Sequence, residues 1–235
     1  MLSTLVLKVK RAESPPYALA KSAAKAALAL ELPLPGSVRP AVLALHRAGR
    51  AVEAAVSEAR AVVYARPVCR SLCASAGARL RVARVPEVSG NVQMHLGDDV
   101  VLSGVLGVKG GRAVDAPELR IGNRVFIGHR VTFSIGRSVV VEDDVLIAQG
   151  CFIADNSGHP LDAEARAAGR PVDPDDVRPV RICRKAWVGR GAVILPGVTV
   201  GEGAIVGAGS VVTRDVPPFG VCVGNPGRVL DRRAG

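Results

Sequence analysis

The sequence predicts a mainly β protein: a parallel β-helix over its C-terminal two-thirds, preceded by an α-helical region. Aliphatic residues recur at every sixth position between Ile182 and Val212, and glycines fill the places between them. A period of six belongs to neither an α-helix nor an ordinary strand, and it indicates one short strand and one turn per repeat. Aromatic residues make up only 3% of the chain, which suits a core too narrow for large rings.

The repeats between residues 182 and 217 are uninterrupted, and each has two inward positions. The first is aliphatic and the second, four residues later, is small or β-branched: Ile182, Val188, Ile194, Val200, Val206 and Val212, then Ala186, Ala192, Val198, Ala204, Ser210 and Val216. The glycines are expected at corners that need a positive φ or a close backbone approach. Because one such repeat cannot bury its apolar face alone, the repeats are expected to stack.

Earlier repeats are less regular. Hexads begin at Leu96 and Leu102, residues 109–118 interrupt them as a loop, and the pattern resumes at Ile121. After Phe133 the register slips by two residues, which indicates a bulge or a widened corner. We therefore divide the chain into a basic helical region, residues 1–84, and a β-helix domain, residues 85–235.

The N-terminal third carries the excess positive charge. Residues 1–84 contain 14 Lys and Arg against 4 Asp and Glu, whereas residues 85–235 contain 17 of each sign. Helices are expected over residues 17–32 and 40–65, with a short third before Gly77. This region could lie on an anionic membrane surface, gather a lipid-linked acceptor, cap the open end of the β-helix, or pack between subunits. Nucleic acid is not an expected partner, because the basic residues have no aromatic platform.

Cysteine usage and the N-terminus bear on the compartment. The chain has 5 cysteines, an odd number without CxxC spacing, which favours reduced thiols. The first residues are apolar and then basic, the reverse of a secretory signal, and no apolar run is long enough to span a membrane. A cytoplasmic protein is expected, with peripheral contact at the inner membrane face as a further option.

Residues 155–181 interrupt the hexads with a charged, proline-rich segment and are expected to leave the coil as an excursion. A long irregular insertion in a compact repeat is usually functional. His159 lies near its start and precedes Pro160, whose ring restrains it. An imidazole titrates near neutral pH, so His159 is the candidate general base.

The run HPLDAEARAAGR, followed by RPVRI and AWVG, resembles the maltose acetyltransferase-like sugar O-acetyltransferases among the hexapeptide-repeat acyltransferases. The resemblance covers roughly residues 96–230. It implies a left-handed β-helix, an acetyl-CoA donor, a sugar, polysaccharide or lipid-linked sugar acceptor, and a homotrimer with donor clefts between neighbours. It also implies that His159 removes the proton of the acceptor hydroxyl while a backbone N–H stabilises the oxyanion.

The same resemblance assigns the remaining site residues. Gly207 and Ala208 would lie along the pantetheine arm, where small side chains allow close approach. Thr213 and Arg214 match the family's TKD corner, and Arg228 matches its GNPARV motif, here GNPGRV. Trp187 would form a wall of the site, and Asp155 and Asn156 would meet an acceptor hydroxyl.

Other interpretations remain open. One is a non-catalytic trimeric scaffold, and another is a metalloprotein of the γ-carbonic-anhydrase kind. The latter needs three histidines on zinc, whereas His129 and His159 stand 30 residues apart with no histidine nearby, so no metal is expected. His46, His95 and His129 are given no functional role. An amine acceptor could replace the hydroxyl, since the same base would serve either.

Overall fold

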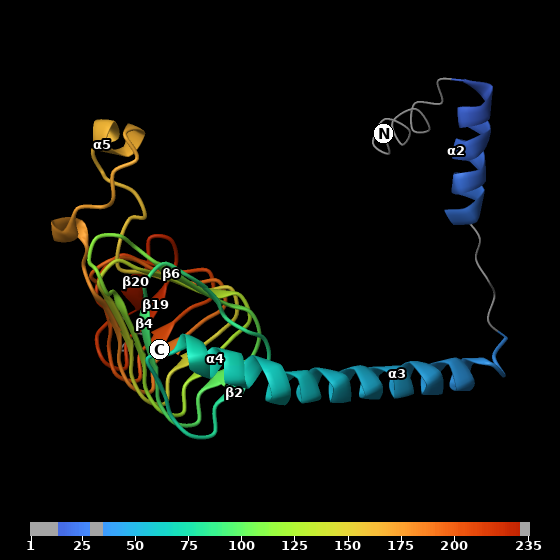
Figure 1. The fold of residues 1–235 in the computed structure, drawn as a ribbon, viewed down its shortest axis with the longest axis horizontal. Helices are drawn as coiled ribbons and strands as arrows, with labels where there is room; N and C mark the ends of the chain where they lie inside the picture. The colour runs from blue at the N-terminus through green and yellow to red at the C-terminus, as the bar shows by residue number, and fades with distance from the viewer. Residues whose placement is uncertain (1–13, 29–34, 231–235) are drawn as a thin grey trace. The chain divides into compact units, whose positions relative to one another are not determined.

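The computed structural model describes residues 14–28 and 35–230 (Figure 1). The chain divides into two compact units, Met1–Glu53 and Ala54–Gly235. Helix α2 (Pro15–Leu28) lies in the first unit, and α3 (Arg39–Arg60) begins there. A π-helical turn, η1 (Ala61–Ala65), and α4 (Arg66–Leu72) follow. The helix expected over residues 17–32 thus begins two residues earlier, and its last four residues lie outside the described part. The one expected over residues 40–65 is α3 together with η1.

Three parallel sheets form the faces of a prism, and consecutive strands pass from one sheet to the next. Sheet A contains β1 (Ser75–Ala76), β4 (Gln93–Leu96), β7 (Glu118–Ile121), β10 (Ser138–Val141), β13 (Val180–Ile182) and β16 (Thr199–Val200). Sheet B contains β2 (Arg81–Val82), β5 (Val101–Leu102), β8 (Phe126–Ile127), β11 (Leu146–Ile147), β14 (Trp187–Val188), β17 (Ile205–Val206), β19 (Val221–Val223) and β20 (Arg228–Leu230). Sheet C contains β3 (Glu87–Ser89), β6 (Leu106–Gly110), β9 (Val131–Ile135), β12 (Phe152–Ala154), β15 (Val193–Ile194) and β18 (Val211–Val212).

This architecture is the parallel β-helix that the hexads predict, with the left-handed sense that the family resemblance implies. Every ladder within the three sheets is parallel except the last, where β20 pairs antiparallel with β19 and ends sheet B. We call the three edges of the prism the A–B, B–C and C–A corners. The expected hexad positions are confirmed as the core, since none of the twelve inward residues from Ile182 to Val216 is more than 2% exposed.

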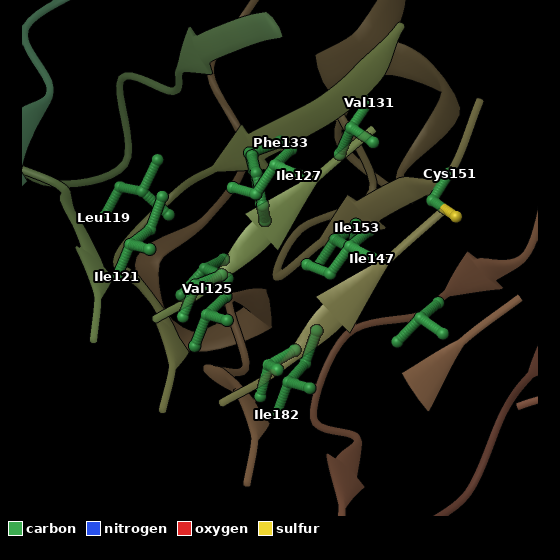
Figure 2. Packing of buried hydrophobic residues seen from close by; sticks show 14 of the residues in the cluster. Leu119, Ile121, Val125, Ile127, Val131, Phe133, Ile147, Cys151, Ile153 and Ile182 are labelled. Carbon is green, nitrogen blue, oxygen red and sulfur yellow. The ribbon is translucent and has the colours of Figure 1, made fainter. Parts of the chain in front are cut away.

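The apolar side chains fill the centre of the prism as stacked layers. Figure 2 shows Ile127, Ile147 and Ile153 directed into this core, with Phe133 as the large ring among them. The two-residue slip has a simple structural form: β9 runs five residues, and both Phe133 and Ile135 point inward. The sheet C strand of this coil is therefore longer than the strand of a regular hexad.

The first coil begins earlier than residue 85. Strands β1 and β2 pair in parallel with β4 and β5, so residues 75–82 already belong to the β-helix. Leu80 and Val82 are buried in the core, and η1 and α4 cover its end with Ala61, Ala65 and Cys69. This coil has no clear glycine hexad, which is why its sequence gave no repeat signal.

At the A–B corner a left-handed residue recurs in coil after coil. Arg79, Asp99, Arg124, Asp144 and Lys185 all have φ between 52° and 60°. The charges alternate along this edge: Arg79 contacts Asp99 with both nitrogen–oxygen distances at 2.6 Å, and Arg124 contacts Asp144 at 2.6 and 2.9 Å. Paired charges thus stabilise a corner conformation that non-glycine residues rarely adopt.

Candidate active site

The excursion leaves the prism at the C–A corner, between β12 and β13. It contains α5 (Ala163–Ala167) and a short 3₁₀ turn, η2 (Pro174–Asp176), and its ends meet where Arg178 N donates to Asp155 O at 2.9 Å. Figure 1 shows α5 standing off the stacked coils. The loop at residues 111–117, between β6 and β7, leaves the same corner two coils earlier. Both irregular segments therefore project from one edge of the β-helix.

Asp155 forms the base of the excursion. Its side chain is fully buried and accepts hydrogen bonds from the backbone N–H groups of Gly136, Arg137 and Ser138 at 2.5, 2.8 and 2.7 Å. The Asn156 amide donates a fourth bond at 2.8 Å. A carboxylate offers about four acceptor positions, so this one is saturated by the fold. Asp155 therefore holds the corner, and the structure leaves it no free position for the predicted contact with an acceptor hydroxyl.

Asn156 fixes the backbone leading to the histidine. Its Nδ2 atom also donates to Ser134 O at 3.2 Å, and its Oδ1 atom accepts from Gly158 N at 2.9 Å. Gly158 has φ +78°, which turns the chain outward. Ser157 Oγ then donates to the His159 carbonyl at 2.6 Å. The segment thus holds the His159 backbone in place while its side chain stays exposed.

Two cavities adjoin this segment. The smaller, about 310 Å³, is lined by His159, Asn156 and Gly158, by both irregular segments and by Gly136. The larger, about 690 Å³, lies against sheet C and is lined by Ser134, Phe152, Asn156, Leu161, Asp175 and Arg178, among others. Asn156 and Gly158 line both cavities. Among the described residues the His159 imidazole makes no hydrogen bond, so its nitrogens can meet a ligand.

Trp187 lies on another face. It is half exposed on sheet B, where the outward positions of six neighbouring strands form an unbroken apolar column: Val101, Phe126, Leu146, Trp187, Ile205 and Val221. Trp187 lines neither cavity beside His159. Within a single chain the predicted aromatic wall and the candidate base are therefore apart.

The expected donor residues lie on two corners and one strand. Gly207 and the exposed Ala208 are at the B–C corner, Thr213 and Arg214 are exposed at the C–A corner, and Arg228 is exposed on β20. Asp215 fixes the second corner by accepting from Thr199 N at 2.7 Å. Among the described residues neither Arg214 nor Arg228 has a hydrogen-bond or salt-bridge partner. Both guanidinium groups could therefore bind phosphate.

The other histidines differ from His159. His46 is exposed on α3, and His95 Nδ1 lies 2.9 Å from Ser75 Oγ. His129 Nδ1 accepts from Val105 N at 3.1 Å, and its ring lies over Gly104 beside a separate groove on sheet C. In the part of the chain that the structure describes, no three His, Cys, Asp or Glu side chains gather as a metal site. All five cysteines are free, and burial raises the pKa of the Cys151 thiol.

Comparison with known families bears on the repeats. Residues 179–214 match the family described as bacterial transferase hexapeptide (six repeats), and residues 118–154 match the hexapeptide repeat of succinyl-transferase. The β-helix is built of hexapeptide repeats. These two matches cover the coils on either side of the excursion, and His159 lies in the stretch between them.

Individual proteins of similar sequence are described as acetyltransferases, several of them as putative ones. Galactoside O-acetyltransferase of Escherichia coli K12 is 36% identical over 112 residues, which is 48% of this chain and 53% of that protein. The chain spans about half the length of the curated relatives that it matches. A crystal structure of galactoside acetyltransferase with coenzyme A has a TM-score of 0.51 at 24% identity and covers 71% of this chain and 68% of that one.

A second solved structure, the polysialic-acid-specific acetyltransferase, also has a TM-score of 0.51 at 24% identity. It covers 68% of this chain and 83% of that one. An N-acyltransferase from Bacillus cereus, solved with dTDP and 3-hydroxybutyryl-CoA, reaches 0.53 at 17% identity and covers 72% and 88%. At these identities the structural likeness establishes the shared fold.

Sequence reasoning did not find the residues that share the small cavity with His159. Arg112 comes from the loop at residues 111–117, and Arg166 and Arg170 come from the excursion itself. The signal was present in the repeat pattern, since both segments interrupt the hexads after the third strand of a coil. Two segments that each follow the third strand of a coil must leave the β-helix at the same corner.

Proposed function

We propose that the protein is an acetyl-CoA-dependent O-acetyltransferase that acetylates a hydroxyl of a sugar, free or within a polysaccharide or lipid-linked unit. The observation that carries the proposal is the position of His159. It is an exposed imidazole at the mouth of a cavity, on a segment fixed by Asp155 and Asn156. That segment lies between two runs of hexapeptide repeats, in a chain that is 36% identical over 112 residues to galactoside O-acetyltransferase. An amine acceptor would use the same base.

His159 acts as the general base in this proposal. Acetyl-CoA supplies the acetyl group as a thioester. His159 takes the hydroxyl proton of the sugar as the new ester C–O bond forms and the thioester C–S bond breaks, and the proton then passes to the departing thiolate. Asn156 keeps the His159 backbone in position through its bonds to Asp155 and Gly158. Arg214 and Arg228 bind the phosphates of the donor, and Gly207, Ala208 and Thr213 line its arm.

A homotrimer completes the site. Gly207 and Ala208 lie at the B–C corner, whereas Arg214 lies at the C–A corner with the excursion, so two neighbouring chains are needed to enclose one donor. The apolar column on sheet B, with Leu146 49% and Trp187 50% exposed, provides a face for such a neighbour. A cyclic trimer is the closed symmetry that a three-sided prism favours. It would also bring Trp187 toward the site of an adjacent chain.

The cellular location is part of the proposal. We place the protein in the cytoplasm because its five thiols are free, and we assign peripheral contact with an anionic membrane to the basic residues 1–84. No helix in the described part of the chain has the length and hydropathy to cross a bilayer. Sedimentation with vesicles containing anionic lipid, compared with neutral vesicles, tests the contact. Equal binding to both would contradict it.

The His159→Ala variant tests the enzyme assignment. Loss of a general base lowers turnover by about 100- to 10,000-fold, measured as thiol release from acetyl-CoA in the presence of a panel of sugars. His46→Ala, which removes an exposed imidazole from α3, is the matched control and should keep its activity. A fall of less than about tenfold in His159→Ala would remove His159 from the mechanism.

A further inference from the structure

We propose that the sugar acceptor carries a negative charge, a carboxylate or a phosphate, bound beside the acetylated hydroxyl by Arg112 and Arg170. This inference rests on the proposed function and specifies its substrate class. The cavity that holds His159 is lined by three arginines and by no aspartate or glutamate. A base and three cations in one small space form an environment suited to an anion.

The three arginines are not equivalent. Arg166 is used by the fold, because its Nη1 atom donates to the carbonyls of Pro160 and Leu161 at 2.9 and 3.1 Å. Among the described residues, Arg112 and Arg170 have no hydrogen-bond or salt-bridge partner. They belong to the two different irregular segments and meet at one cavity only because both segments leave the C–A corner. Planar guanidinium groups bind carboxylate and phosphate oxygens in pairs, which also orients the ligand.

The donor does not account for these cations. In acetyl-CoA the phosphates are separated from the thioester by the long pantetheine arm, and the thioester must react next to His159. A cavity of about 310 Å³ is at the small end of ligand sites and suits a single sugar ring rather than that arm with its phosphates. Charges in the same cavity as the base therefore act on the acceptor.

The test compares matched sugars in the full chain: glucose, glucuronic acid and glucose 6-phosphate, with the corresponding galactose series. Calorimetric binding and acetyl transfer are both measured. The charged sugars should bind at least about ten times more tightly than the neutral parent sugar. Comparison of the uronic acid with the sugar phosphate shows which anion is preferred. Equal binding of neutral and charged sugars overturns the inference. Absence of transfer to every sugar, with the binding preference kept, contradicts the proposed function instead.

Variants assign the effect to the two arginines. Arg170→Gln and Arg112→Gln should raise KM for the charged sugar about 10- to 100-fold, the loss expected for one charge-assisted hydrogen bond. KM for acetyl-CoA and binding of the neutral sugar should change less than about threefold. Arg170→Lys should recover part of the loss, and Arg81→Gln, an exposed arginine of β2, is the control for net charge. A uniform fall in kcat without a change in KM would overturn the assignment.

A different observation, on α3, supports a second inference: we propose that α3 of three copies of this chain forms a parallel coiled coil. The residues concerned are separated by alternating steps of three and four: Val42, Leu45, Gly49, Val52, Val56 and Ala59. This is the heptad spacing of a coiled-coil seam. No residue of α3 is buried in the chain itself, and Leu45, Val52 and Val56 are 75%, 63% and 62% exposed.

The pattern favours a coiled coil over a membrane-surface helix for α3, so the membrane contact proposed above rests on the basic residues of 1–84 outside α3. A helix lying on a membrane has a broad apolar face, whereas this stripe is narrow and keeps a period of 3.5 residues. Alanines at positions 48 and 55, beside the seam, leave room for close packing, and Glu53 and Arg60 place charges at its rim. β-Branched residues occupy both kinds of core position, at Val52 and Val56, which favours more than two strands.

In the second unit, the seam residue Val56 is exposed, whereas the chain's own packing uses other residues. Ala61 and Ala65, in the π-helical turn, are buried against the first coil. Ala61 lies about 200° around a helix from Ala59, so the chain uses the opposite face for its own packing. Three copies of the chain supply three α3 helices, the number of strands that the core residues favour. Two further copies of this chain are therefore the occupants that fit the seam.

Cysteine cross-linking in the full chain tests the coiled coil. Val52→Cys, in a Cys73→Ser and Cys183→Ser background, should give covalent dimers under mild oxidation with diamide. Ala54→Cys, on the outer face, is the matched control and should not. If Val52→Cys fails to cross-link, or cross-links no better than Ala54→Cys, the proposed coiled coil of α3 is contradicted. This outcome would count against it for a trimer as well as for a monomer.

A dilution series provides an independent check. Paired Val52→Asp and Val56→Asp should raise the concentration at which the oligomer dissociates by about tenfold or more, because charges would be buried in the seam. Ala54→Asp and Ser57→Asp add the same charge on other faces and should shift it less than about threefold. If both double variants raised the dissociation concentration equally, the proposed seam would be contradicted.

Discussion

At the scale of single residues, Asp155 illustrates how a polar side chain near a site can serve the fold. Its position next to Asn156 and His159 suggested an acceptor contact, and only the geometry revealed three backbone N–H groups converging on it. Those groups come from a corner that lies one coil earlier. The residue types alone do not distinguish a ligand contact from such a corner.

The Asp155→Ala variant should lose stability. It would leave buried N–H groups without an acceptor, each costing about 1–3 kcal/mol, so the loss should reach about 3 kcal/mol or more in urea unfolding. Asp162→Ala is the comparison, because Asp162 only caps α5 by accepting from Ala165 N and should cost about 1 kcal/mol. Equal losses in the two variants would contradict the structural role of Asp155.

The charge pairs at the A–B corner predict a dependence on pH. Hydrogen bonds from Arg124 lower the pKa of Asp144 below its ordinary 3.8, and those from Arg79 do the same for Asp99. A lowered carboxyl pKa stabilises the fold above the unfolded value and loses that effect as pH falls through the folded value. Arg124→Gln should therefore lower the urea midpoint at neutral pH and have little effect near pH 2.

The control for this prediction is Arg84→Gln, which removes an exposed arginine that has no hydrogen-bond or salt-bridge partner among the described residues. Because these pairs are exposed, the effect should be small and should weaken in high salt. A difference between wild type and Arg124→Gln that stays constant from neutral to acidic pH would show that the ion pair is not its cause.

At the scale of elements, the corners decide how closely the coils stack. Gly189 and Gly191 belong to one corner and differ in what a side chain would meet. A Cβ at Gly189 would lie 2.6 Å from Val206 O and 2.7 Å from Ala208 N, both backbone atoms of the next coil. At Gly191, with φ +66°, a Cβ would meet nothing within 4 Å. Gly189 is required because the next coil lies too close for a side chain, whereas Gly191 is required only because of its positive φ.

Gly189→Ala should therefore destabilise the protein more than Gly191→Ala. The left-handed conformation costs a non-glycine residue about 1 kcal/mol, which is the loss expected at Gly191. At Gly189 the coils must separate, so about 2 kcal/mol or more is expected, as for other overpacked sites. Thermal and urea unfolding of the two variants compare them directly. The reverse order would contradict the assigned roles.

At the scale of the whole molecule, the boundary of the β-helix matters for any truncation. A chain lacking residues 1–53 keeps the complete second unit and should fold with a cooperative thermal transition. A chain beginning at residue 85 loses β1 and β2 of the first coil and the helical cap, including the buried Cys69, Leu80 and Val82. It should melt at a lower temperature or aggregate. Equal stability of the two truncations would show that the first coil is dispensable.

The period of six by itself determined the β-helix, its inward residues and the place where the excursion leaves it, because stacking requires each repeat to present the same positions to the core. The sequence also singled out His159, since an insertion into so regular a pattern is visible in one dimension. The first coil was missed, because it contains no clear glycine hexad.

Only the tertiary structure decided which side chains share a cavity. Arg112 and Arg170 lie far apart in the sequence but line the space beside His159, because each coil returns the chain to the same corner. It also separated Trp187 from His159 within one chain by placing them on different sides of the prism. The physical reason is that the hexads fix whether each residue points into or out of its coil. The lengths of the loops decide which side chains from different coils meet in one cavity.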